Sequence, residues 1–231
     1  MHQTSGYLKD EMEEEFSYRT LLRYLHEENY NLRFPRKTSL KQDEAKREAY
    51  KIRLKCILEE PNAEVWFEDE SGIEGDPRPR RRWAKRGKKG TIPYQGLHIR
   101  QNILGAVCPN TGEFVSILFD YCDRQSFQAL IDEIAKHTLE RSKSKKVYII
   151  LDNASWHKTK CLNWHHLNAV YLPPYSPDYN PIERLWLNLK SQFFSDFIAI
   201  TPEELINRIC FAIMHYVKNS EQVASICKIA K

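Results

Sequence analysis

The order of apolar and polar positions along the 231-residue chain predicts a short helical segment followed by a larger mixed domain. Helical spacing of apolar residues begins after Ser17, which can cap a helix that runs to about Glu28. A basic, extended linker follows, and residues 40–58 resume helical periodicity with many alternating charges. Because these helices are too small to hold a core alone, we assign residues 1–60 to an N-terminal segment and residues 61–231 to the main domain.

The main domain opens with three predicted strands. Alternation of period two runs through residues 64–70, 99–107 and 113–119. The last two strands are joined by the turn Cys108–Gly112, which places them side by side in opposite directions. The pattern therefore predicts an antiparallel meander.

Helices and buried strands alternate through the rest of the chain. The pattern predicts a helix over 123–141, a strand over 147–152, a short helix over 158–167, a strand over 169–172, and helices over 181–194 and 202–217. Three antiparallel strands followed by alternating helix and strand is the order of the ribonuclease-H-like fold, a mixed sheet of about five strands flanked by helices. The predicted class is thus α/β, with the small helical segment at the N-terminus.

Composition is that of a globular protein, with 42% hydrophobic and 12% aromatic residues. No stretch approaches the roughly 18 apolar residues of a membrane span, and the Glu-rich N-terminus lacks the regions of a signal peptide. We therefore expect a cytoplasmic protein without a membrane partner. The six cysteines form no C-x-x-C pair, so neither a zinc ribbon nor a disulfide framework is indicated.

Positive charge is concentrated in one segment, although the formal net charge is only +4. Between positions 78 and 89, eight of twelve residues are basic: Arg78, Arg80, Arg81, Arg82, Lys85, Arg86, Lys88 and Lys89. Such a segment can bind the phosphate backbone of DNA. The alternatives are a solvated hairpin loop or a chance similarity to a nuclear-localisation sequence.

Three acidic residues lie where separate predicted elements end or begin. Asp69 comes late in the first strand, on the face shared by Val65 and Phe67, whereas its acidic neighbours point to the other face. Asp152 ends a buried strand, and Glu183 lies in the first turn of a helix for which the preceding asparagine offers an N-cap. Groups at the carboxyl ends of neighbouring strands converge on one crevice, so we expect these acids to meet there.

Three close carboxylates point to a divalent metal. They repel one another and raise one another's pKa unless cations neutralise them, and their hard oxygen ligands suit Mg²⁺ or Mn²⁺. Two ions about 3.5–4 Å apart can activate a water or a 3′-hydroxyl and stabilise the leaving oxygen during phosphodiester attack. The alternative is that each acid is a solvated surface charge, or in the case of Glu183 a partner of the helix dipole.

Several motifs together resemble the catalytic domain of DDE transposases, in the bacterial insertion-sequence branch of the mariner-like superfamily. The resemblance covers about residues 63–195. The motifs are Asp69-Glu70-Ser71, Leu151-Asp152-Asn153-Ala154 with His157, Leu172-Pro-Pro-Tyr-Ser-Pro177, and Asn180-Pro-Ile-Glu183 with Trp186.

The resemblance implies that Asp69, Asp152 and Glu183 are the catalytic triad and hold two Mg²⁺ or Mn²⁺ ions. Asn153, His157 and Asn180 match motif positions around the triad, where they would support it. Each also has a structural alternative. Asn153 can fix a turn, His157 can be a hydrogen-bonded residue at a helix start, and Asn180 can serve as a helix cap and nothing more.

Two features depart from the family pattern. Thirty residues separate Asp152 from Glu183, a few fewer than is usual, and the shortfall falls between positions 158 and 169. Residues 17–49 resemble only the end of the family's N-terminal DNA-binding region, namely the last helix of its second helix-turn-helix and the linker, so residues 1–60 would be a partial helix-turn-helix remnant with its linker. We therefore expect the product of a truncated element, or a downstream reading frame that frameshifting joins to an upstream one.

The activity that the resemblance implies is metal-dependent cleavage of DNA at terminal inverted repeats and transfer of the cut ends to a target. The expected partners are double-stranded DNA and a second copy of the chain, in the cytoplasm at the nucleoid. Two alternatives remain open. One is a nuclease of the same fold that cuts branched DNA or an RNA–DNA hybrid, and the other is a non-catalytic remnant that binds DNA or a full-length transposase.

Overall fold

The computed structural model describes residues 17–31, 39–78, 83, 85–88, 90–121 and 123–229. The chain forms two compact units, 1–39 and 40–231. In the first unit, helix α2 (Tyr18–Glu27) begins as predicted at Ser17, whose Oγ accepts a hydrogen bond from the Thr20 N–H at 3.1 Å. No helix in the described ranges is long and apolar enough to cross a membrane.

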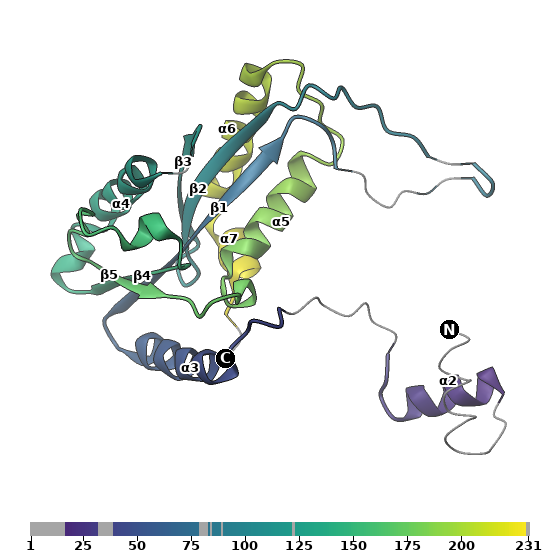
Figure 1. Ribbon diagram of the computed structural model, residues 1–231, viewed down its shortest axis with the longest axis horizontal. Helices are drawn as coiled ribbons and strands as arrows, with labels where there is room; N and C mark the ends of the chain where they lie inside the picture. Colours follow the sequence, from purple (N-terminus) through teal and green to yellow (C-terminus); the bar gives the residue numbers. More distant parts are fainter. Residues whose placement is uncertain are drawn as a thin grey trace. The chain divides into compact units, whose positions relative to one another are not determined.

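A five-stranded sheet in the order β3-β2-β1-β4-β5 forms the centre of the second unit (Figure 1). Strand β2 runs antiparallel to β1 and β3, whereas β4 is parallel to both β1 and β5. This topology confirms the predicted mixed α/β sheet. The strands are β1 (Ala63–Glu74), β2 (Arg100–Cys108), β3 (Glu113–Phe119), β4 (Lys146–Leu151) and β5 (Leu167–Tyr171).

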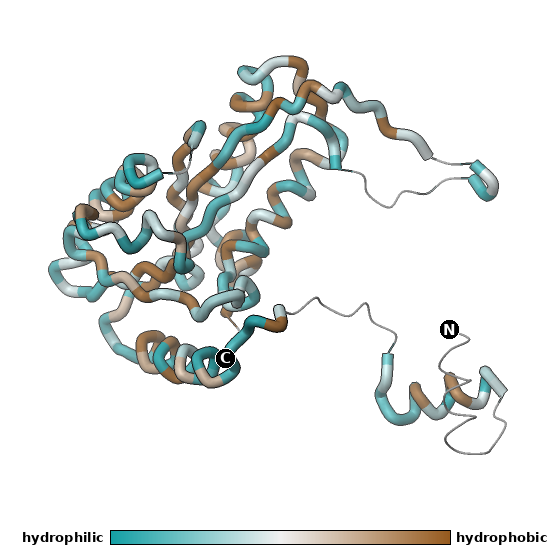
Figure 2. Tube along the Cα trace, in the orientation of Figure 1, coloured by the Kyte–Doolittle hydropathy of each residue, from teal (hydrophilic) through white to brown (hydrophobic). Residues whose placement is uncertain are grey.

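Helices cover both faces of the sheet. They are α3 (Glu44–Glu59), α4 (Arg124–Thr138), α5 (Ile182–Phe193), α6 (Pro202–Lys218) and α7 (Ser220–Cys227), with short 3-10 helices η1 (Arg141–Lys143), η2 (Ser155–Lys158) and η3 (Pro177–Tyr179). Figure 2 shows hydrophobic residues along the central strands and, in the helices, hydrophobic residues alternating with hydrophilic ones. This is the pattern of helices that bury one side against a sheet.

Strand β1 divides its side chains between two separate cores. Val65 and Phe67 lie in the core beneath α3, α5, α6 and α7, whereas Trp66 lies in the core beneath α4. The predicted assignment of Asp69 to the face of Val65 and Phe67 is therefore correct, and it turns this carboxyl toward α5.

Over the residues that it describes, the structure lacks one predicted helix and contains one α-helix that was not predicted. The short helix expected over 158–167 is absent from that described stretch, which holds the end of η2 and turns. Asn163 Oδ1 accepts the His165 N–H at 3.0 Å, and His165 has a left-handed backbone with φ of 49°. A side chain that bonds its own backbone competes with helix formation. Helix α7 was not predicted because its eight residues make only about two turns, which is too short for helical periodicity to be recognised.

Helix α3 lies within the second unit, whereas the sequence placed it in the N-terminal segment that ends at residue 60. Its Tyr50 and Ile57 are buried in the core over β1. These two positions are seven residues apart among many charges, so the periodicity predicts the helix, but its apolar stripe is too narrow to indicate that the helix packs on the main domain. The functional division of the chain at residue 60 stays a prediction.

Candidate active site

A cleft of about 530 Å³ holds all three predicted acids, Asp69, Asp152 and Glu183, in its wall. Strand β4 pairs with β1 only as far as Phe67, so β1 extends beyond the parallel pairing where it carries Asp69. Asp152 is the first residue after β4, and Glu183 is the second residue of α5. The structure thus brings to one cleft three acids that lie far apart in the sequence.

Burial and mutual repulsion disturb the ionisation of two of these acids. Burial is the largest cause that raises the pKa of Asp69 to about 8, and the carboxylates of Glu183 and Asp152 contribute to this shift. Burial also raises the pKa of Glu183, while the nearby Lys190 ammonium acts in the opposite direction. The cleft therefore lacks enough positive charge to keep Asp69 fully ionised at neutral pH.

Asp152 differs because hydrogen bonds stabilise its ionised form. Its Oδ1 lies 2.9 Å from His157 Nδ1 and accepts the Ala154 N–H at 2.8 Å. The contact with His157 lowers the pKa of Asp152, and the backbone N–H adds to this effect. His157 itself is buried and packs on the Phe127 ring, with ring centroids 4.2 Å apart. Of the predicted supporting residues, this histidine lies directly behind Asp152.

A hydrogen bond from helix α5 holds the Asp69 carboxyl. Trp186 Nε1, one turn into α5, donates a hydrogen bond to Asp69 Oδ2 at 3.1 Å. The bond joins the carboxyl on β1 to the helix that carries Glu183. Because Trp186 is itself buried, its indole can hold the carboxyl at a fixed angle.

Asn180 does not cap α5, contrary to the sequence prediction. The helix is capped at Pro181 without a side-chain hydrogen bond, and Asn180 Nδ2 instead donates to the backbone oxygen of Glu68 at 2.7 Å. The amide cannot turn back to the helix while it makes this bond across the sheet. It ties the start of α5 to β1 beside Asp69.

Asn153 bridges two segments at the edge of the cleft. Its Nδ2 donates to the backbone oxygen of Leu172, and its Oδ1 accepts from Lys158 Nζ at 2.7 Å. This agrees with the alternative in which the asparagine fixes a turn. It links the end of β4 to the proline-rich segment that follows β5.

Glu68 is a buried acid that the sequence did not single out. Its carboxyl oxygens have no hydrogen-bond partner among the described residues, and Oε2 lies 3.7 Å from His157 Nε2. Burial, with a further contribution from Asp69, raises the pKa of Glu68 well above its ordinary range. Alternation correctly places it on the face opposite Asp69, but that face is a second core and not solvent.

The basic segment is described only in part. Arg78, Lys85, Arg86 and Lys88 are exposed, whereas Arg80, Arg81, Arg82 and Lys89 lie outside the described residues. At the base of this segment, Asp76 accepts the backbone N–H groups of residues 95 and 96 at 2.7 and 3.1 Å. The pKa of Lys190 in the site is lowered mainly by burial and next by the positive charge of Arg78. Arg78 is therefore electrostatically coupled to the site.

The three acids fit a divalent cation by their chemistry. Carboxylate oxygens are the ligands that Mg²⁺ and Mn²⁺ prefer, and the raised pKa of Asp69 marks a place where a cation is favourable. In the described part of the chain, no three histidine, cysteine or acidic side chains are already close enough together to hold a metal ion. The acids share a cleft in the present geometry without forming a closed set of ligands.

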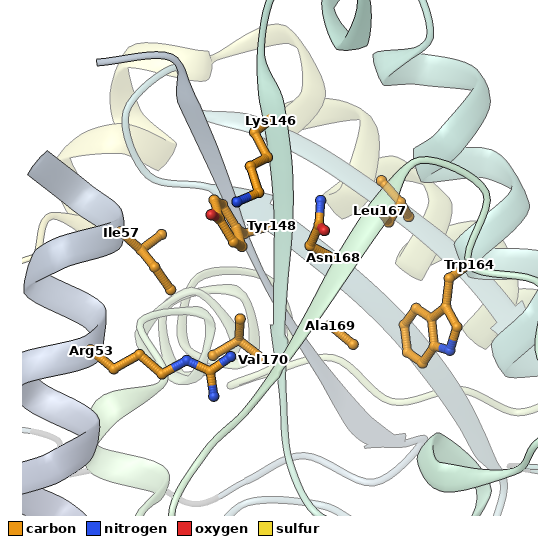
Figure 3. Close-up of a pocket in the computed structure, with 9 residues that line it drawn as sticks. All are labelled: Arg53, Ile57, Lys146, Tyr148, Trp164, Leu167, Asn168, Ala169 and Val170. Carbon is orange, nitrogen blue, oxygen red and sulfur yellow. The ribbon is translucent and has the colours of Figure 1, made fainter. Parts of the chain in front are cut away.

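A second cavity, of about 490 Å³, lies beside the open edge of β5 (Figure 3). Arg53, Lys146 and Tyr148 line it, and Lys146 Nζ lies 5.0 Å from the centre of the Tyr148 ring. Its described lining contains no carboxylate, histidine or cysteine. The carboxylate cleft is therefore the better candidate for an active site.

The free energy of unfolding of the metal-free chain is expected to fall as pH rises from about 4 to about 8. The Asp69 carboxyl keeps its proton in the folded state up to a pKa of about 8, whereas its ordinary value is 3.8. The contribution of this protonated carboxyl to the free energy of unfolding is fully present below pH 3.8. It is lost as pH rises through 8, at up to about 1.4 kcal/mol per pH unit. Urea unfolding of the wild type and Asp69→Asn at several pH values measures this loss. Identical pH dependence in the two proteins would contradict the assignment.

The chain is similar in sequence to a known family and to two bacterial proteins. A family model described as DDE superfamily endonuclease matches residues 64–206. The uncharacterized protein y4pE/y4sA of Sinorhizobium fredii is 30% identical over 125 residues, which make up 54% of this chain and 90% of that protein. The insertion element IS630 uncharacterized 39 kDa protein of Shigella sonnei is 29% identical over 173 residues, or 73% of this chain. The matched region is 49% of the IS630 protein, so the chain spans about half the length of that relative.

Solved structures share the fold. The mariner Mos1 paired end complex with Mg has a TM-score of 0.63 at 15% identity, over 98% of this chain and 75% of that one. The corresponding Mos1 complex with Mn also has a TM-score of 0.63, at 13% identity, over 96% of this chain and 71% of that one. These similarities confirm the predicted ribonuclease-H-like class of fold.

Proposed function

The chain belongs to the DDE superfamily endonucleases, and from this premise we propose that it is a metal-dependent transposase that cuts DNA at terminal inverted repeats and joins the ends to a target. The observation that carries the proposal is the convergence of Asp69, Asp152 and Glu183, from two strands and a helix, on one cleft. Similarity to an insertion-element protein supports the choice of transposition over other phosphodiester chemistry.

In this proposal the three acids hold two Mg²⁺ or Mn²⁺ ions. When bound, the ions supply charge that activates the attacking oxygen and stabilises the leaving oxygen. The side chains do the positioning: Trp186 holds the Asp69 carboxyl, and His157 holds that of Asp152. Solved complexes of the Mos1 transposase with Mg and with Mn support this choice of metals.

The proposed partner is double-stranded DNA, both at the ends of the element and at the target. The basic residues from Arg78 to Lys89 are proposed to contact its phosphates, because clustered cations release counterions from DNA on binding. We further propose that the chain acts as a homodimer, so that two copies can hold two ends, and that it works in the cytoplasm at the nucleoid. In this proposal residues 1–60 belong to the part that recognises DNA.

The test is a cleavage assay on the purified chain. A labelled duplex carrying an end of the mobile element that encodes the chain is incubated with Mg²⁺ or Mn²⁺, and products are resolved on a denaturing gel. We expect a nick at the element end that disappears when the metal is chelated. If the chain is folded by circular dichroism yet cuts this DNA with neither metal, the proposal fails.

A further inference from the structure

Tyr175 lines the same cleft as the acids but takes no part in the chemistry proposed above. It lies in the motif that leads from β5 to α5, and its backbone φ is 57°, in the left-handed region that tyrosine rarely adopts. Its side chain is exposed, with 53% of the residue's surface accessible. The chain thus holds a large ring in an unfavourable backbone conformation without burying it.

The backbone of Tyr175 is fixed from a distant part of the chain. Gln42 Nε2, just before α3, donates a hydrogen bond to the Tyr175 backbone oxygen at 2.6 Å. Lys41 Nζ lies 5.9 Å from the centre of the Tyr175 ring. Two residues just before α3 therefore contact both the backbone and the ring of Tyr175.

Arg47 of α3 fixes the residues that follow. Its guanidinium donates to Ser176 Oγ at 2.8 Å and to both carboxylate oxygens of Asp178 at 3.2 and 2.8 Å. It also lies 4.3 Å from the centre of the Tyr179 ring, and only 12% of its side chain is exposed. A bidentate, stacked arginine is a rigid contact, so the cleft wall on this side is held in one conformation.

An exposed ring on a rigid wall is suited to stack on a flat partner. Tyr175 makes no side-chain hydrogen bond with the described residues, so its hydroxyl does not account for its position. Strained residues held by their surroundings cluster at ligand contacts. In a cleft that takes DNA, the flat partner is a nucleobase, and every base has a π face that an aromatic ring can stack on.

We propose that Tyr175 stacks on an unpaired nucleobase of the DNA strand that enters the cleft, and that Gln42 and Arg47 are positioning residues for it. This inference rests on the proposed function, because it requires DNA in the cleft. It also defines a feature of the DNA substrate: next to the bond that is cut, one nucleotide leaves the base stack of the duplex.

The experiment compares three versions of residue 175. A duplex with an unpaired 2-aminopurine beside the expected nick is titrated with wild type, Tyr175→Phe and Tyr175→Gly, without metal, so that no cutting occurs. Stacking quenches 2-aminopurine fluorescence. We expect quenching with wild type and Tyr175→Phe, and with Tyr175→Gly we expect its loss and about tenfold weaker binding.

The glycine variant separates a binding role from a structural one. Because glycine adopts a positive φ without strain, Tyr175→Gly should unfold at no lower a urea concentration than wild type. Tyr121 is a matched control: it is 84% exposed and does not line the cleft, so Tyr121→Ala should leave quenching and binding unchanged.

The outcomes distinguish this inference from the proposed function. Unchanged quenching and affinity in Tyr175→Gly would overturn the stacking role, even if the wild type cuts DNA as proposed. Loss of quenching in Tyr175→Gly alone would support stacking even if the wild type cuts nothing, and in that case only the catalytic proposal would fail. Equal loss in Tyr121→Ala would also overturn the inference.

Discussion

Asp152→Asn is expected to lower the rate of metal-dependent DNA cleavage by at least about a thousandfold, because a carboxylate that holds metal contributes several kcal/mol to stabilising the transition state. The substitution removes one negative charge and leaves the size of the side chain unchanged. The amide oxygen can still accept the Ala154 N–H, and 59% of the Asp152 side chain is exposed. The variant should therefore stay folded, and the loss should appear in the cleavage rate at saturating metal.

Glu70→Gln is the matched control for this change. Glu70 is next to Asp69 but pairs with Leu104 of the opposite core face, and it does not line the cleft. Its loss of charge should change the cleavage rate only a few-fold. Wild-type rates in Asp152→Asn would contradict the role of Asp152 as a metal ligand. An equal loss in Glu70→Gln would show that a general change in charge lowers the rate, and not the loss of a metal ligand.

Local patterns predicted the acids and the fold because each depends on short stretches of chain. Strand alternation placed Asp69 on the face of Val65 and Phe67, and the structure puts both in the core under α5. The end of a buried strand marked Asp152, and a proline-led helix start marked Glu183. Each of these signals spans fewer than about ten residues, which is the range over which periodicity is informative.

Contacts between distant residues left no such signal. Asn180 bonds the backbone of Glu68 across 112 positions, and Arg47 pairs with Asp178 across 131. The sequence marked Asn180 as a motif residue and left Arg47 unmarked, but in neither case does a local pattern identify the distant partner, so only the folded chain shows what they hold. The left-handed backbone of Tyr175 is hidden in the same way, because the hydrogen bond that holds it comes from Gln42, 133 positions away.

These distant contacts explain how the acids are held. Trp186 and Asn180 both tie the start of α5 to β1, so Glu183 and Asp69 cannot move independently. Across the sheet, His157 fixes Asp152 from the opposite core. Because the triad is held from both sides of the sheet, packing changes beneath it should affect the site as well as stability.

Gly105→Ala is expected to lower the free energy of unfolding by about 2 kcal/mol through overpacking. Gly105 pairs with Asp69 across β1 and β2. A Cβ there would lie 2.7 Å from Trp186 Cη2 and 3.0 Å from Phe114 Cε2, both on buried rings that have little room to move. Urea unfolding should show a lower midpoint with an unchanged m value.

The same substitution should reach the active site through Trp186, because a displaced indole cannot keep its hydrogen bond to Asp69. We therefore expect cleavage to need more metal for half-maximal rate, under conditions where the variant is still folded. Gly72→Ala is the control, since its Cβ would meet only the flexible end of exposed Arg100, and alanine suits a strand better than glycine. If Gly72→Ala destabilises the chain as much, overpacking against the indole is not the cause of the loss of stability. If Gly105→Ala leaves the metal requirement unchanged, the indole does not position Asp69.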